Sequence, residues 1–135
     1  MGSILRKLTV LALLLGITNA YAQSKNGGWE KIGQKQVDFK VEKDILKVTS
    51  AKGNFTKVKL KVRGASVNFY DMKIYFGNGQ MQDVSLRSVI PAGGESRVID
   101  LDGNDRVINR IEFVYDTKNN PEKSPKATVV VWAKD

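Results

Sequence analysis

The sequence contains neither cysteine nor histidine in its 135 residues. Without cysteine the chain cannot form disulfides, so its stability must come from packing and strand pairing. The absence of both residue types also excludes Ser–His and Cys–His nucleophilic chemistry, and metal sites built from thiolates or imidazoles. Catalysis or binding would have to use carboxylates, Lys, Arg and Tyr.

Long hydrophobic runs are also scarce. One such run, Leu8 to Ile17, follows Arg6 and Lys7 and precedes the small-x-small pattern Ala20-Tyr21-Ala22. This order is typical of a signal peptide, so we expect residues 1–22 to be removed and the protein to be exported to the periplasm or outside the cell. An uncleaved membrane anchor is the alternative, although the run is short for a bilayer span. No transmembrane segment is expected after cleavage.

Amphipathic helical patterns are missing, and alternation with a period of two takes their place. In the segment 56–63, Val58, Leu60 and Val62 alternate with basic residues, which predicts a strand with one face in a core and one in water. After Gly64-Ala65-Ser66, the apolar run Val67–Phe76 is expected to fold back beside this strand.

Two local signals refine this pattern. The apolar phase slips between Phe69 and Met72, which predicts a β-bulge near Tyr70-Asp71. Asn78-Gly79 predicts a tight hairpin turn with positive φ at both central residues. With about eight or nine short strands, the sequence predicts an all-β fold: a single antiparallel β-sandwich, jelly-roll or Ig-like, over residues 29–135. Residues 23–28 are expected to form a flexible lead-in.

The order of several motifs resembles a family of short exported bacterial β-sandwich proteins that carry a domain of unknown function. The resemblance covers nearly all of the chain from Trp29 onward and implies export and an all-β fold. It implies no activity, cofactor or site residue. The motifs that carry it are Gly64-Ala65-Ser66-Val67-x-Phe69, Gly77-Asn78-Gly79, Arg87, Ile90-x-x-Gly93, Ile99-Asp100-Leu101 and Arg106-x-Ile108-x-x-Ile111-x-Phe113, followed by a Val-rich strand.

Positive charge is concentrated in the first strands. The chain has a formal net charge of +8, and residues 23–63 hold 11 basic and 4 acidic residues, whereas residues 64–135 hold 9 and 10. A basic sheet face can attract an anionic polymer, lipid headgroups or nucleic acid. It can equally be an ordinary solvated face that protects the sheet from aggregation.

Aromatic residues are expected to lie beside the basic residues of this face. Tyr75 and Lys73 share the outward phase of their strand, so they would lie beside the basic residues if the two strands pair. Together they would form a surface for stacking and charge pairing. Trp29, Tyr70 and Trp132 are further aromatics that can reach the surface. The candidate binding residues are Lys57, Lys59, Lys61, Arg63, Lys73 and Tyr75.

These residues suggest two functions. The first is a non-enzymatic envelope protein that binds an anionic polymer or a carbohydrate through the basic face. The second is a structural or protein-interaction module that pairs with another envelope protein through an open sheet edge or the Trp29/Trp132 region. Nucleic acid is not expected as a partner.

Neither a catalytic residue nor a cofactor or metal is expected. Asp71 and Asp83 could approach across their hairpin, but outward charges beside Lys73 and Arg87 explain them equally well. The segment Asp100–Asp105 has the composition of a calcium loop, but it does not follow the EF-hand pattern and also fits an ordinary turn.

Overall fold

A computed structural model of the chain describes residues 27–37, 43–48, 53–116 and 126–135. The chain divides into two compact units, Met1–Glu30 and Lys31–Asp135. The predicted signal peptide lies outside the described residues, as do residues 23–26 of the lead-in. In the part of the chain that the structure describes, no helix has the length and apolar character needed to cross a membrane.

The described residues form nine strands and no helix, which confirms the predicted all-β fold. The strands are β1 (Trp29–Gln36), β2 (Lys43–Lys47), β3 (Asn54–Phe55), β4 (Lys57–Arg63), β5 (Val67–Phe76), β6 (Met81–Ile90), β7 (Ile99–Asp100), β8 (Arg106–Asp116) and β9 (Thr128–Lys134).

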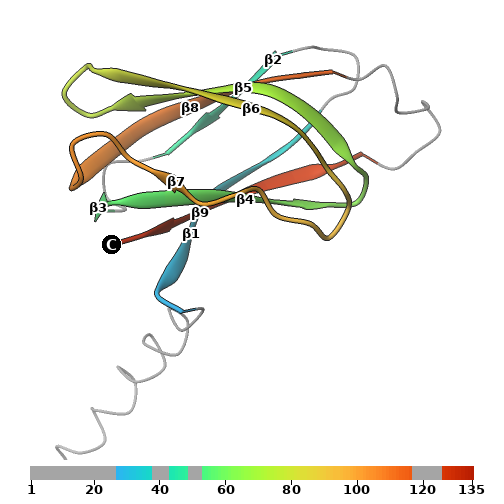
Figure 1. Cartoon of the computed structure of the whole chain (residues 1–135), viewed down its shortest axis with the longest axis horizontal. Coiled ribbons are helices and arrows are strands. Elements are labelled where there is room, and N and C mark those ends of the chain that lie inside the picture. Colours follow the sequence, from blue (N-terminus) through green and yellow to red (C-terminus); the bar gives the residue numbers. More distant parts are fainter. Residues whose placement is uncertain (1–26, 38–42, 49–52, 117–125) are drawn as a thin grey trace, which may run out of the picture. The chain divides into compact units, whose positions relative to one another are not determined.

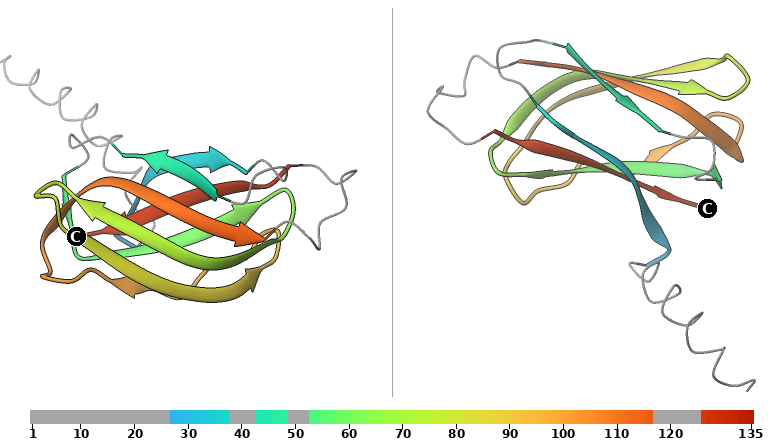
Figure 2. Two further views of the ribbon diagram at one scale, coloured as in Figure 1. Left: turned by 90° about the horizontal axis from the view of Figure 1, so that it is seen from above. Right: turned by 180° about the vertical axis from the view of Figure 1, so that it is seen from behind.

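The strands form two sheets that face each other across one core (Figures 1 and 2). Sheet A has the order β1-β9-β4-β7, and sheet B has the order β2-β8-β5-β6, with β3 also pairing with β8. The pairings of β4 with β9 and β7, and of β5 with β6 and β8, run antiparallel. This arrangement confirms the predicted antiparallel β-sandwich.

The alternating residues of both sheets fill the core. Val58, Leu60 and Val62 of β4 are fully buried, and so are Val129 and Val131 of β9. From sheet B, the rings of Phe69 and Phe113 meet edge to face with their centroids 5.9 Å apart. Since neighbouring side chains on a strand point to opposite faces, the basic residues of β4 lie on the outer face of sheet A.

The pairing of β4 with β5 expected from the sequence is wrong. β4 lies in sheet A and β5 in sheet B, so the short connection 64–66 crosses from one sheet to the other. Both edges of β4 are already occupied: β9 pairs along one side, and on the other side the Val62 N–H donates to the Gly94 carbonyl at 3.0 Å. No backbone edge of β4 is left to receive β5.

The bulge predicted near Tyr70-Asp71 is confirmed, because the register of β5 shifts between Phe69 and Asp71 against both of its neighbours. The hairpin at Asn78-Gly79 also forms, but its turn type differs from the prediction. Only Gly79 has a positive φ, at 93°, and its N–H donates to the Phe76 carbonyl at 3.0 Å. This is the longer hairpin loop, in which a type I turn is followed by a left-handed glycine.

Candidate functional site

The predicted site residues lie on opposite sides of the sandwich. The outer face of sheet A carries Lys57, Lys59, Lys61 and Arg63, all on β4. The outer face of sheet B carries Lys73 and Tyr75, on β5. The composite surface of Lys and Tyr side chains predicted from the sequence is therefore wrong, because it depended on pairing between β4 and β5.

On sheet B, Lys73 and Tyr75 have local partners. Lys73 Nζ lies 3.3 Å from an Asp83 carboxylate oxygen, and the Arg110 guanidinium stacks 3.7 Å from the centre of the Tyr75 ring. Arg110 in turn lies 3.6 Å from Glu112, which is buried and also pairs with Lys43. Each of these three cations has a carboxylate partner, as on an ordinary solvated sheet.

On sheet A, the first three lysines of β4 also have carboxylate partners. Lys57 Nζ lies 3.1 Å from Asp100, whereas Lys59 and Lys61 share Glu95 at 3.2 Å and 3.6 Å. Two lysines on one carboxylate leave an excess of one positive charge at this point. Exposed pairs of this kind contribute little to stability, about 0–1 kcal/mol each.

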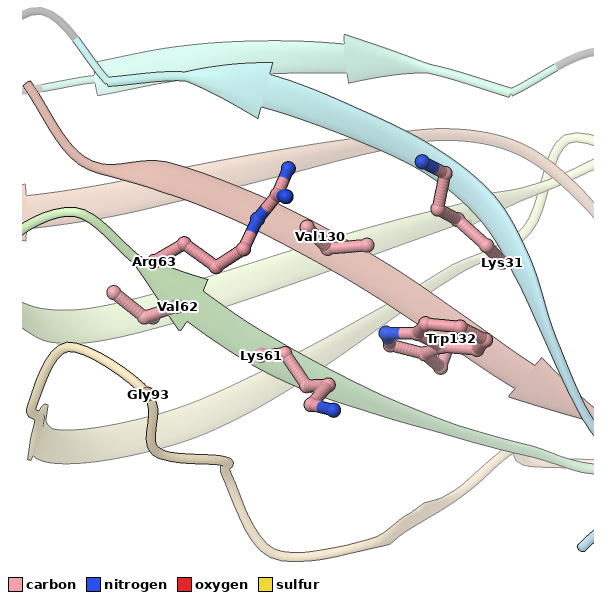
Figure 3. Close-up of a pocket in the computed structure, with 7 residues that line it drawn as sticks. All are labelled: Lys31, Lys61, Val62, Arg63, Gly93, Val130 and Trp132. Atoms are coloured by element: carbon pink, nitrogen blue, oxygen red, sulfur yellow. The ribbon is translucent and has the colours of Figure 1, made fainter. Parts of the chain in front are cut away.

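A pocket of about 250 Å³ opens beside this excess charge on the same face (Figure 3). Its floor is apolar and its rim is basic. Arg63 of β4 and Lys31 of β1 extend toward each other across β9, and the ring of Trp132 lies below them. The lining residues are Lys31, Lys61, Val62, Arg63, Gly93, Val130 and Trp132.

The registers of the strands explain why these side chains meet. Lys61 is paired with Val130 and Arg63 with Thr128, so the outward-facing side chains of β4 lie directly beside those of β9. Trp132 lies diagonally from Lys61, whose Nζ is 5.8 Å from the centre of the indole ring. This distance is within the range of a cation–π contact.

Lys31 and Arg63 are the cations of this pocket that have no carboxylate partner among the described residues. Both instead donate to the side-chain oxygen of Gln34, Lys31 Nζ at 3.0 Å and Arg63 Nη2 at 3.4 Å. The Nε1 atom of Trp132 is buried and has no hydrogen-bond partner among the described residues. The pocket therefore combines unbalanced positive charge with an aromatic surface.

A second and larger hollow, of about 460 Å³, lies between the hairpin loop after Phe76 and the turn before Arg106, and Arg106 is one of its lining residues. Its guanidinium donates to the Asp102 carbonyl at 2.6 Å and to the Gln80 side chain at 2.7 Å, and it stacks 3.8 Å from the centre of the Phe76 ring. These donors are already used to hold the two loops together. We therefore regard the pocket on sheet A as the candidate site in spite of its smaller volume.

The segment with the composition of a calcium loop forms a turn. Gly103 and Asn104 have positive φ values of 84° and 66°, as turn residues do. Within the described residues, no cluster of three acidic side chains could hold a metal ion. Arg106 places a positive charge against the Asp102 carbonyl, where a calcium ion would need an oxygen ligand free.

Sequence reasoning identified Lys61, Arg63 and Trp132 but missed Lys31 and Gln34. Lys31 and Gln34 lie on β1, which joins sheet A beside β9, about a hundred residues away in sequence. Their polar side chains gave no signal by themselves, because polar residues are expected on any solvated strand.

The fold and the pocket define a small antiparallel β-sandwich with a basic, aromatic site on the outer face of one sheet. A family model matches residues 8–133, and the chain belongs to the family that carries the domain of unknown function DUF2541. This confirms the resemblance to a family with a domain of unknown function. A comparison with curated proteins gives no match.

Two solved structures are among those similar to this chain. AlgX from Pseudomonas aeruginosa has 12% sequence identity and a TM-score of 0.48; the similarity covers 78% of this chain but 27% of AlgX. A family 29 carbohydrate-binding module from Piromyces equi has 14% identity and a TM-score of 0.39, with 82% of this chain and 83% of the module covered. At these values, neither similarity bears on the ligand of this chain.

Proposed function

We propose that the protein is an exported, non-enzymatic β-sandwich that binds an anionic or carbohydrate component of the cell envelope through the outer face of sheet A. One observation carries this proposal: three cationic side chains, Lys31, Lys61 and Arg63, gather around Trp132 in one pocket. Export, to the periplasm or the cell exterior, is proposed from the pattern of residues 1–22.

The charge arrangement favours a ligand-binding role over a purely structural one. Like charges that lie close together repel, and this repulsion is reduced when a carboxylate lies between them. On sheet B, Lys73 pairs with Asp83, and Lys43 and Arg110 share Glu112. Within the part of the chain that the structure describes, Arg63 and Lys31 have only a neutral amide oxygen as their partner, so an anionic ligand would supply the missing negative charge.

The positions of the two candidate acids, Asp71 and Asp83, favour a binding role over an enzymatic one. Asp83, one of the two candidate acids, pairs with Lys73 at 3.3 Å. Asp71 and Asp83 line neither of the two pockets described above. A pair of carboxylates acting on a glycosidic bond would need a cleft between them that holds the substrate.

Pairing with another protein through a sheet edge is less well supported. β6, an edge strand of sheet B, has an irregular register with β5 around Arg87, a non-glycine residue with a φ of 42°. The side chain of Gln82 also bridges to the 100–102 segment, donating to the Asp100 carbonyl at 3.0 Å. Irregularities and bridges of this kind protect an edge from pairing with another chain.

The double variant Lys61→Gln/Arg63→Gln is expected to weaken polyanion binding about ten-fold, because it removes charge-assisted donors from the pocket. Binding would be measured by calorimetry with dextran sulfate, oligogalacturonate and anionic vesicles at about 0.05 M and about 0.5 M NaCl. The affinity of the native protein for the probe that it binds should fall steeply between the two salt concentrations, and the affinity of the variant should fall less.

The matched control is Lys47→Gln/Lys73→Gln, which removes the same charge from sheet B. Lys47 is exposed on β2 and Lys73 lies on β5. This control should bind almost as tightly as the native protein. Equal losses in the two double variants would mean that net charge alone drives binding, and would contradict a site on sheet A.

A further inference from the structure

Among the described residues, the polar side chains that line the pocket on sheet A are all hydrogen-bond donors. Lysine, arginine and tryptophan side chains donate but have no acceptor atom, and the other lining residues, Val62, Gly93 and Val130, have no polar side-chain atom. A neutral sugar presents hydroxyl groups that both donate and accept, so it is normally bound by acceptors as well as donors. A pocket with donors alone fits a ligand group that only accepts, such as a carboxylate, sulfate or phosphate.

Gln34 indicates where that acceptor would lie. Its Oε1 atom accepts from Lys31 Nζ at 3.0 Å and from Arg63 Nη2 at 3.4 Å. Since both neighbours only donate, the oxygen and not the amide nitrogen must face them. This planar carbonyl group has the shape of half a carboxylate. A carboxylate in the same place would keep both hydrogen bonds and add the charge attraction that a neutral amide cannot supply.

The Gln34 side chain can move away from Lys31 and Arg63 to make room for a ligand. Its residue is exposed on β1, and both contacts are made by its side chain. A side chain that holds two cations by two surface hydrogen bonds can rotate into solvent at little cost. The arrangement is consistent with an internal acceptor that a charged ligand displaces.

The remaining surface of the pocket fits the apolar face of a sugar ring. The indole of Trp132 gives the pocket a flat, rigid surface of apolar atoms. Val130, which is buried, precedes it by two residues on the same face of β9. The volume of about 250 Å³ is below the range of about 300–1,000 Å³ typical of drug-sized ligands, so it suits one ring rather than several.

We infer that the pocket binds a carboxylate-bearing sugar residue of an acidic glycan. The carboxylate takes the place of Gln34 Oε1 between Lys31 and Arg63, and the sugar ring stacks on Trp132. This inference rests on the proposed function and names the ligand class of the same site. A lipid surface lacks a rigid ring to stack on the indole, and a polyphosphate lacks both the ring and the planar acid.

The variant Gln34→Glu tests the position of the carboxylate directly. It changes an amide to an acid of the same shape, so the new side chain should occupy the place of the ligand and weaken oligogalacturonate binding about ten-fold. Gln34→Ala, which empties this place, should bind within about three-fold of the native protein or more tightly. Equal affinity of Gln34→Glu and the native protein would overturn the inference.

Gln36→Glu is the matched control, since it introduces the same charge two residues along the same strand at an exposed position. We expect it to change the affinity less than about three-fold. A loss as large as that of Gln34→Glu would mean that an acid anywhere on β1 weakens binding by general repulsion. That result would remove the assigned role of Gln34 and overturn the inference.

A panel of ligands tests the chemical class. Oligogalacturonate and hyaluronan oligomers carry sugar carboxylates, carboxyl-reduced oligogalacturonate has the same backbone without charge, and polyaspartate has carboxylates without sugar rings. The native protein should bind at least one of the sugar acids about ten-fold more tightly than the reduced oligomer and polyaspartate.

The other outcomes separate the two proposals. Tighter binding of dextran sulfate or anionic vesicles, still dependent on Lys61 and Arg63, would overturn the sugar carboxylate and keep the proposed function. If polyaspartate bound as tightly as the sugar acids, the inference would also be overturned, because the site would then recognise carboxylates without a sugar ring. Binding of no polyanion through Lys61 and Arg63 would overturn both.

Discussion

Replacing Trp132 with alanine is expected to weaken binding of the sugar acid about 10- to 100-fold, if the stacked sugar ring contributes as much as a nucleic-acid base stacked on an aromatic side chain, about 1–3 kcal/mol. The indole forms the largest flat surface of the pocket and holds Lys61 within 5.8 Å of its ring centre. Its removal therefore takes away both the stacking surface and a contact that positions a cation. Calorimetry with oligogalacturonate and hyaluronan oligomers would measure the loss.

Two further variants serve as controls for Trp132→Ala. Trp132→Phe keeps a ring but removes the N–H, and a loss of about three-fold is expected for it. Tyr75→Ala on sheet B should leave binding unchanged, because its ring lies under Arg110 on the opposite outer face. Thermal unfolding followed by circular dichroism would show that each variant is folded. A folded Trp132→Ala protein that binds like the native one would contradict the site.

The largest effect on stability is expected from Gly64→Ala, which should lower the free energy of unfolding by about 3 kcal/mol. Gly64 has a φ of 90°, which is unfavourable for a residue with a Cβ atom. In addition, that Cβ would lie 2.5 Å from the Lys126 carbonyl oxygen, which is backbone and cannot rotate away. The end of β4, which carries Arg63, would have to separate from the start of β9. Urea denaturation would measure the change.

Gly79→Ala is the control that isolates the steric term. Gly79 has almost the same φ, 93°, but nothing lies within 4 Å of the added Cβ. It should therefore show only the cost of the left-handed conformation, about 1 kcal/mol. Equal losses for the two variants would show that the close approach of Gly64 to Lys126 does not matter.

Local patterns predicted the fold well because they depend on neighbouring residues. The alternation of Val58, Leu60 and Val62 with lysines identified both faces of β4, and all three apolar residues are fully buried. The phase slip after Phe69 located the bulge in β5. These signals reflect the fixed geometry of a strand, in which successive side chains point to opposite faces.

The strand order could not be predicted in the same way, and the errors in the site follow from it. A short connection such as 64–66 can form a hairpin or cross between sheets, and only the partners of β4 decide which. Since β4 is paired on both sides by segments later in the sequence, Lys73 and Tyr75 are placed on the other sheet. For the same reason, no local pattern indicated that Lys31 and Gln34 lie beside Arg63.

The central claim is that a ligand enters the pocket beside Trp132, and the indole N–H reports on it directly. The chain has 2 tryptophans, so a nitrogen–proton correlation spectrum should show two indole signals, and Trp132→Phe identifies the one from Trp132. We predict that this signal shifts during titration with whichever acidic glycan oligomer binds, and reaches its limit as binding saturates. Saturated binding with an unmoved Trp132 signal would contradict the site described for sheet A.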